Sequence, residues 1–253
     1  MQDIRSYVNC FNYKIYNKSY DELINLLNQR MTQNKTSTVF AINPNKVMMA
    51  KKNIEIDQLL QSADILIPDG SGIIMAAKWM NQSIPYQITG IDLMEALCRL
   101  AQTYQYGVYL YGAKKENLYK ACCNLKSRYP SLHLAGSSHG YLENQMKVVQ
   151  SIRDSKADIL FTGLGSPAQE KFIIHYRTDM PNVKIFLGVG GAIDVFSGNV
   201  KRAPKWVQQC HGEWLYRFAS QPSRIVQKNN ILPFIIYSLR LSMRKEKYEN
   251  EKD

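Results

Sequence analysis

The chain alternates short apolar runs with segments of helical periodicity, and this alternation constrains its fold more than any other feature. The runs, which we predict to be strands, are 37–42, 64–67, 107–111, 132–136, 158–162 and 184–189. Apolar residues recur at helical spacing in 20–30, 45–62, 71–80, 92–104, 115–128, 144–155 and 167–178. Because parallel strands need long crossovers that are usually helical, this order predicts an α/β fold with a mostly parallel sheet covered on both faces.

Polar or glycine-rich turns follow five of the six predicted strands. They are Asn43-Pro44-Asn45, Pro68-Asp69-Gly70-Ser71-Gly72, Gly112, Gly163-Leu164-Gly165-Ser166-Pro167 and Gly190-Gly191-Ala192-Ile193-Asp194. In open α/β sheets, ligands bind outside the carboxyl ends of the strands. The turns therefore predict a ligand-binding rim along one edge of the sheet.

The turn before the predicted helix 167–178 has two interpretations. Ser166 can cap a helix whose first residue is Pro167, with Gln169 as the reciprocal capping partner. The same glycine-rich helix start can also bind a phosphate or a sugar hydroxyl through its free N–H groups. Neither this turn nor the one at 188–191 matches the dinucleotide pattern G-x-G-x-x-G, which disfavours a dinucleotide site.

Two acidic residues in these turns are candidates for chemistry. Asp69 lies in a tight Pro-Asp-Gly turn and is either a turn former or a catalytic base. Asp194 either caps a short helix or accepts hydrogen bonds from a uracil or a ribose. Asp92 is expected to cap the helix 92–104.

Positive charge is concentrated near the C-terminus. The net charge is +11, and the residues from Lys201 onward include 11 Lys/Arg against 5 Asp/Glu. Between 201 and 224 the cations alternate with aromatic residues. This pattern fits a diphosphate clamp, a single-stranded nucleic-acid site or a surface amphipathic helix with its cations in water. The basic excess by itself fits either an anionic partner or a solvated protein surface.

The sequence contains few features typical of a metal site or of a secreted protein. It contains no Asp-x-Asp pair, and its four histidines lack metal-ligand spacing, so we expect no metal and no cofactor. If a sugar nucleotide is the substrate, arginines must then neutralise its diphosphate. The odd number of cysteines, the absence of signal-peptide character and the lack of a membrane-spanning apolar run predict a cytoplasmic protein.

Six sequence blocks, taken in order, resemble one enzyme family. They are PDGSGI, TGIDLMEAL, VYLYGAKKE, ADILFTGLGSPAQEKFI, FLGVGGAIDVFSGNVKRAPKW and GEWLYRFASQPSR. Together they are similar to the WecG/TagA/CpsF glycosyltransferases from about Val39 to Arg224. The chain departs from the usual family residues at Ala41, Gln87, Ala168, Gly212 and Gln227.

The resemblance implies a Rossmann-like catalytic core at 1–200 and a basic, helical, membrane-associating appendage at 201–253. It implies inverting transfer of an N-acetylmannosamine-type sugar from a UDP-sugar to a polyprenyl-diphosphate-linked aminosugar, in surface polysaccharide or teichoic acid synthesis. Asp69 would be the catalytic base, and Arg217 and Arg224 would stabilise the leaving diphosphate. The expected substrate-binding residues are Asn43, Gly70, Gly90, Asp92, Gly112, Gly163, Gly165, Gln169, Glu170, Gly191, Asp194, Arg202 and Trp214.

The segment from Ile231 onward mixes apolar residues with Arg240, Arg244, Lys245 and Lys247. It predicts an interfacial helix that binds anionic lipid on the inner face of the membrane. The alternative is a helix packed on the protein's own core or on a neighbouring subunit of a homo-oligomer.

Two other functions are compatible with parts of the sequence. Ala41 and Gln87 support a sugar-nucleotide-binding module with impaired catalysis. The basic, aromatic C-terminal region alone supports a nucleic-acid binder, whose affinity would depend steeply on salt. That second function leaves the glycine-rich turns unexplained, so we expect no nucleic-acid partner.

Overall fold

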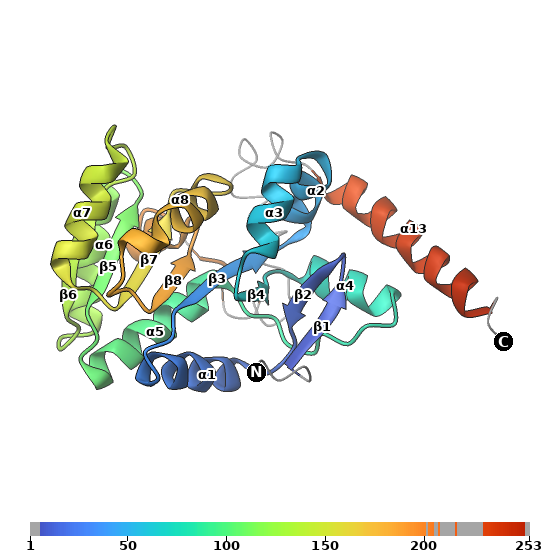
Figure 1. Ribbon diagram of the computed structural model, residues 1–253, viewed down its shortest axis with the longest axis horizontal. Coiled ribbons are helices and arrows are strands. Elements are labelled where there is room, and N and C mark those ends of the chain that lie inside the picture. The colour runs from blue at the N-terminus through green and yellow to red at the C-terminus, as the bar shows by residue number, and fades with distance from the viewer. Residues whose placement is uncertain (1–5, 201, 205–206, 208–215, 217–229, 251–253) are drawn as a thin grey trace.

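The computed structural model describes residues 6–200, 202–204, 207, 216 and 230–250, and its centre is an eight-stranded sheet (Figure 1). The strand order is β1-β2-β4-β3-β8-β7-β5-β6. The strands are β1 (Tyr7–Cys10), β2 (Tyr13–Tyr16), β3 (Ser37–Ile42), β4 (Ile65–Pro68), β5 (Val108–Gly112), β6 (Leu134–Ser138), β7 (Ile159–Gly163) and β8 (Ile185–Gly188). Of these strands only β1 and β2 pair antiparallel, which confirms the predicted α/β fold with a mostly parallel, Rossmann-like sheet.

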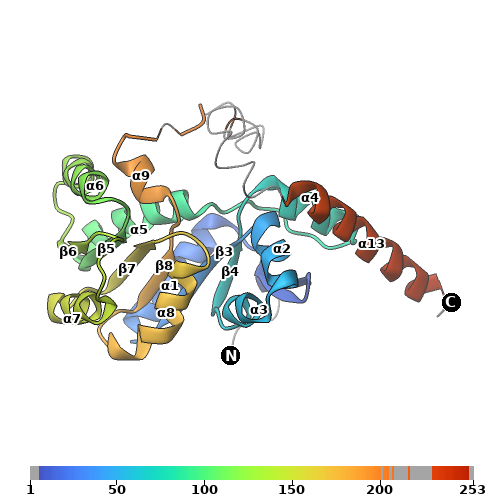
Figure 2. The same cartoon turned by 90° about the horizontal axis from the view of Figure 1, so that it is seen from above.

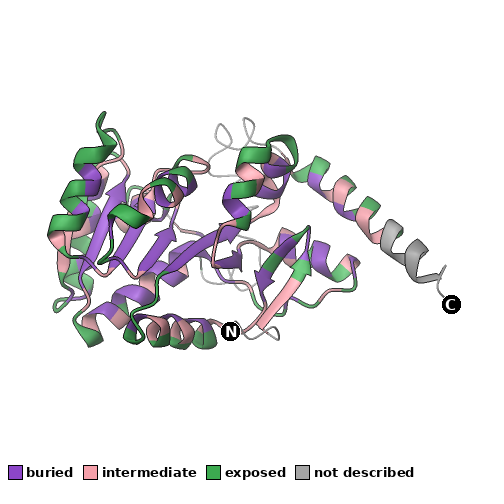
Figure 3. Ribbon diagram, viewed as in Figure 1, coloured by how far each residue is buried: buried purple, intermediate pink, exposed green. Residues whose placement is uncertain are grey.

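Helices cover both faces of this sheet. They are α1 (Tyr20–Thr32), α2 (Pro44–Lys52), α3 (Ile54–Gln61), α4 (Ser71–Trp79), α5 (Gly90–Tyr104), α6 (Lys115–Arg128), α7 (Gln145–Ser155), α8 (Ala168–Tyr176), α9 (Ala192–Phe196) and α13 (Ile231–Asn250). Side chains alternate between two cores because successive residues of a strand point to opposite faces. Phe40 and Ile42 of β3 pack with α2, α4 and α8, whereas Val39 and Ala41 pack with α1, α5 and α9. Figure 3 shows most of the strands buried between helices whose outer faces are exposed.

The structure contains a hairpin that the sequence did not predict. β1 and β2 are joined by Phe11 and Asn12, both in the left-handed conformation, and β2 extends the sheet by pairing parallel with β4. The strands have four residues each, and β1 is only partly buried, so they lack the continuous apolar runs of the inner strands. A two-residue turn with both residues at positive φ is usually recognised in a sequence by the pair Asn-Gly, and this turn has Phe11-Asn12 instead.

The segment 45–62, predicted as one helix, forms two. α2 ends at Lys52, and the Asn53 side chain accepts hydrogen bonds from the backbone N–H groups of Glu55 and Ile56, the first turn of α3. An asparagine cap starts a new helix because it satisfies N–H groups that have no partner within the helix. The apolar period continues through the break, so periodicity alone could not locate it.

Helix α13 packs along α2 and α4 and then extends beyond the body of the protein (Figures 1 and 2). Phe234 is only 2% exposed, and its ring lies 5.2 Å from that of Phe11 at the hairpin turn. Ser238 is buried, and the hydroxyl of Ser242 donates to the carbonyl of Trp79. One face of the predicted interfacial segment is therefore occupied by the protein's own core.

The other face of α13 is apolar and exposed. It carries Leu232, Ile236, Leu239 and Met243 at helical spacing, and the exposed Arg240 lies beside them. No helix within the described ranges combines the length and the apolar character needed to cross a membrane.

Candidate active site

A pocket of about 390 Å³ lies at the carboxyl edge of the sheet. Its walls come from the turns after β3, β4, β7 and β8 and from the first residues of α5. The helices that follow β3 and β8 leave toward opposite faces: α2 packs in one core and α9 in the other. Neighbouring strands whose connections diverge in this way open a crevice at their carboxyl ends. The topology thus explains why the pocket lies here.

Seven of the predicted site residues line this pocket. They are Asn43, Asp69, Gly90, Gly165, Gln169, Gly191 and Arg202. Gly70, Asp92, Gly112, Gly163, Glu170 and Asp194 lie outside its lining. Trp214, Arg217 and Arg224 fall outside the residues that the structure describes.

Asp69 and Asn43 face the pocket from two adjacent strand ends. The backbone N–H of Asp69 donates to the carbonyl of Ile42 at 2.9 Å, which ties the turn after β4 to the end of β3. Asn43 caps α2, because its side-chain oxygen accepts from the Lys46 N–H at 3.0 Å. Gly70 follows with φ of +94°, a conformation that residues with a Cβ rarely adopt, so the turn itself requires this glycine.

The turn after β7 does not use the predicted helix cap. Helix α8 begins at Ala168, and none of the described side chains caps it. The Ser166 hydroxyl donates instead to Glu170 Oε1 at 2.7 Å, and the side-chain oxygen of Gln169 accepts from the Gly190 N–H at 2.9 Å. The capping prediction was wrong because the Ser166 hydroxyl bonds the side chain of Glu170 instead of a backbone N–H, and Gln169 bonds the turn after β8.

A buried ion pair that the sequence did not predict places Lys46 in the pocket lining and Glu170 behind it. Lys46 Nζ is 2.7 Å from Glu170 Oε1 and donates to the carbonyl of Ala41 at 2.7 Å. Burial alone would raise the pKa of Glu170. The charge of Lys46 and the hydrogen bonds from Lys46, Ser166 and Gln169 outweigh burial and lower it. The sequence feature that could have indicated this pair is the position of Lys46, which directly follows a strand-end turn and begins the apolar run Val47-Met48-Met49-Ala50.

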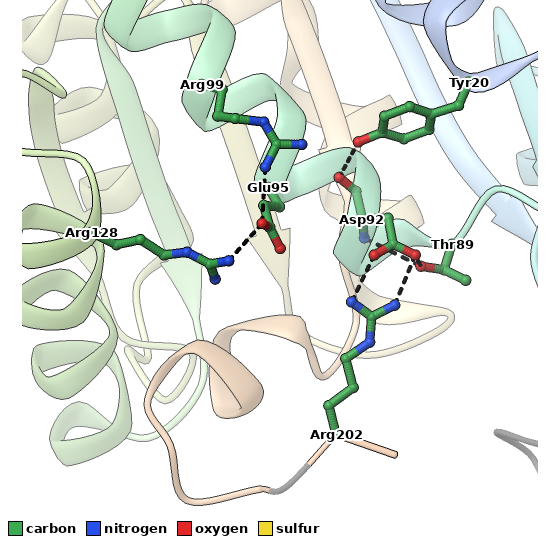
Figure 4. A network of polar contacts seen from close by, with 7 residues as sticks. All are labelled: Tyr20, Thr89, Asp92, Glu95, Arg99, Arg128 and Arg202. Carbon is green, nitrogen blue, oxygen red and sulfur yellow. Dashed lines mark hydrogen bonds and ion pairs between the residues drawn. The ribbon is translucent and has the colours of Figure 1, made fainter. Parts of the chain in front are cut away.

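A second ion pair lies on another wall of the pocket (Figure 4). Arg202 Nη1 and Nη2 reach the two carboxylate oxygens of Asp92 at 2.6 and 2.8 Å, in a bidentate arrangement. Thr89 caps α5 through its own hydroxyl, which also donates to Asp92 at 2.6 Å. The prediction that Asp92 caps this helix was therefore wrong. Asp92 binds Arg202, and Arg202 lines the pocket.

This pair makes part of the protein's stability depend on pH. Burial raises the pKa of Asp92. The hydrogen bonds from Arg202 and Thr89 and the charge of Arg202 together lower it by more, so the pKa lies below the ordinary 3.8. A carboxylate with a lowered folded-state pKa contributes stability above its unfolded pKa and loses it as the pH falls through the folded value. We expect Asp92→Asn to be less stable than the wild type at pH 7 and the difference to shrink below about pH 4. Urea unfolding at several pH values measures this, and a difference independent of pH would contradict it.

The other predicted glycines have packing roles in the structure. A Cβ on Gly112 would collide with the backbone of Gly163 in the next strand, and one on Gly163 would lie 2.9 Å from the Gly190 carbonyl.

Asp194 faces α6, where its carboxylate accepts from Asn117 Nδ2 at 2.6 Å. Within the described ranges, no cluster of three or more His, Cys, Asp or Glu could hold a metal ion.

Comparison with known proteins identifies the family to which the chain belongs. Residues 8–248 match the Glycosyl transferase WecG/TagA/CpsF family, and the chain belongs to that family. One relative, from Bacillus subtilis strain 168, is an N-acetylglucosaminyldiphosphoundecaprenol N-acetyl-beta-D-mannosaminyltransferase. It is 32% identical over 96% of this chain and 95% of its own length. A protein of the same name from Bacillus spizizenii is 37% identical over 77% of this chain and 75% of its own. The glycosyltransferase prediction is confirmed.

Proposed function

We propose that the protein transfers an N-acetylmannosamine-type sugar, with inversion, from a UDP-sugar to a polyprenyl-diphosphate-linked aminosugar. The product would serve bacterial surface polysaccharide or teichoic acid synthesis. The names of the two Bacillus relatives support the transferred sugar and the lipid-linked acceptor. The observation that carries the proposal is the pocket at the divergence of β3 and β8, because it brings Asp69 and Asn43 together with the glycine-rich turns.

The proposed reaction assigns each change in bonding to a group of the protein. Asp69 accepts the proton of the acceptor hydroxyl while that oxygen attacks the anomeric carbon. The bond between this carbon and the β-phosphate oxygen breaks, and UDP leaves with the bonding electrons. Gly90 and Ile91 line the pocket at the start of α5, where backbone N–H groups favour negative charge.

The charges that line the described pocket support a role for the predicted arginines. Lys46 is paired with Glu170, and Arg202 with Asp92, so each cation arrives with a carboxylate. Asp69 adds a further acidic side chain. With the two partner carboxylates counted, which lie outside the lining itself, the described groups at the pocket carry no excess of positive charge, although a diphosphate needs one. We propose that Arg217 and Arg224 supply it.

We also propose that α13 holds the enzyme at the inner face of the membrane. Its inner face is docked on α2 and α4, and its outer face presents Leu232, Ile236, Leu239 and Met243 beside Arg240. The sequence continues with Arg244, Lys245 and Lys247. An apolar stripe flanked by cations binds an anionic lipid surface by burying apolar area and by attracting the headgroups.

Liposome flotation tests this membrane role. Replacing Leu232, Ile236, Leu239 and Met243 together by Ser should abolish most flotation with vesicles containing anionic lipid, because the buried apolar area is lost. A matched control replaces Tyr119, Tyr141 and Met146, which are also exposed but lie on α6, in the loop before α7 and on α7. Unchanged flotation of the α13 variant would contradict the proposal. A fall in oligomer size instead would assign the stripe to a subunit interface.

The reaction itself is tested by a donor screen. Purified full-length protein is mixed with a lipid-diphosphate N-acetylglucosamine acceptor and a series of UDP-sugars, and the release of UDP is measured. UDP release that requires the acceptor supports the transferase. Tight UDP binding without turnover of any donor would favour the catalytically impaired module, for which Ala41 in the pocket lining is the relevant departure.

A further inference from the structure

The floor of the pocket holds a buried ammonium group, that of Lys46. This residue is only 6% exposed, yet it lines the pocket from the first turn of α2. Burying a charge is costly unless it is paired and hydrogen-bonded. A lysine in this position therefore needs a structural or functional reason.

Glu170 keeps the ammonium in place. Its Oε1 accepts from Lys46 Nζ, Ser166 Oγ and Gln169 Nε2 at 2.7, 2.7 and 2.9 Å. Gln169 in turn accepts from the Gly190 N–H. This network joins the turns after β3, β7 and β8, and all its members except Glu170 line the pocket. The network thus fixes the position of the ammonium relative to three walls of the site.

Two of the three N–H donors of the ammonium have acceptors among the described residues. A lysine side chain carries three N–H donors. Among the described residues, Nζ has two acceptors, the carbonyl of Ala41 and the carboxylate of Glu170. No described residue accepts from the third donor, so it can serve a molecule that enters the pocket. A charged donor on a buried side chain prefers a charged oxygen to a neutral one.

We propose that Lys46 binds the donor nucleotide by giving its third hydrogen bond to the diphosphate, and that Glu170 positions it. This inference rests on the proposed function, because it requires a nucleoside diphosphate in the pocket. The Lys46–Glu170 pair adds no net charge. It supplies a fixed donor that needs no rearrangement when the ligand arrives.

Calorimetric titration with UDP and with uridine separates this role from a structural one. The test variant is Lys46→Met with Glu170→Gln, because Lys46→Met alone would leave a buried carboxylate without its counter-ion. The amide that Glu170→Gln introduces can still bond Ser166 and Gln169. We expect UDP affinity to fall roughly 10- to 100-fold, as for a lost hydrogen bond between charged groups, and uridine affinity to stay within about 2-fold.

The matched control removes an exposed pair of the same kind. Lys171 and Glu55 are 2.7 Å apart between α8 and α3, and neither lines the pocket. Lys171→Met with Glu55→Gln should leave both affinities unchanged. Equal UDP affinity in the Lys46 variant and the wild type would overturn the proposal, and so would an equal loss of UDP and uridine affinity. Failure of the wild type to bind UDP would instead refute the proposed function.

A measurement on the wild type covers the case in which the variant does not fold. The nitrogen resonance of the Lys46 ammonium can be followed by NMR in protein labelled at the lysine side chains. Addition of UDP should shift this resonance and slow the exchange of its protons, whereas uridine should not. A resonance that responds equally to both ligands, or to neither while UDP binds, would exclude a contact with the diphosphate.

Discussion

Replacing Asp69 by Asn is expected to lower turnover by about 10²- to 10⁴-fold, the range lost with a general base. Asn is close in shape to Asp but cannot accept the acceptor's proton at neutral pH. The backbone contact that holds the turn, from the Asp69 N–H to the Ile42 carbonyl, does not involve the side chain. The turn should therefore keep its position, and turnover should fall by more than UDP affinity does. Steady-state UDP release in the presence of the lipid acceptor measures the effect.

Asp154→Asn is the matched control for this prediction. Asp154 lies on α7, is exposed and bonds only Gln150 among the partners that the structure gives it. Its replacement should leave turnover unchanged. Normal turnover of a folded Asp69→Asn protein would reject Asp69 as the base. A loss of UDP binding as large as the loss of turnover would point to a ground-state role instead.

Replacing Arg217 by Ala should lower kcat by about 10²- to 10³-fold, the effect of removing a donor aimed at charge in the transition state. Negative charge grows on the β-phosphate oxygen as the bond to the sugar breaks, so the interaction strengthens along the reaction. The fall in kcat should accordingly exceed the fall in UDP affinity. The same expectation holds for Arg224→Ala.

Arg153→Ala controls for the loss of an arginine elsewhere. This residue is exposed on α7, which packs against the edge strand β6; it bonds Gln150 and does not line the pocket. If Arg217→Ala and Arg224→Ala both keep wild-type kcat, the leaving diphosphate must be stabilised by other groups. In that case, the ion pairs of the pocket become the first candidates, beginning with Arg202 and Asp92.

The sequence by itself determined the elements and the edge of the sheet where the site lies. The six strands β3 to β8 and most helices were predicted within a few residues, because short apolar runs and helices with one buried face leave different local periods. The position of Asp69 directly after β4 also followed, since a turn residue at a strand end is a local feature. The family resemblance then restricted the predicted reaction to glycosyl transfer.

Only the tertiary structure decided which of the turns meet in one pocket. The turn at Gly112 follows β5, which lies outside β7 in the sheet, so it does not reach the crevice between β3 and β8. The pairs Lys46–Glu170 and Asp92–Arg202 join residues more than 100 positions apart. Local periodicity contains no information on such contacts, because they depend on strand order and on the direction in which each helix leaves the sheet.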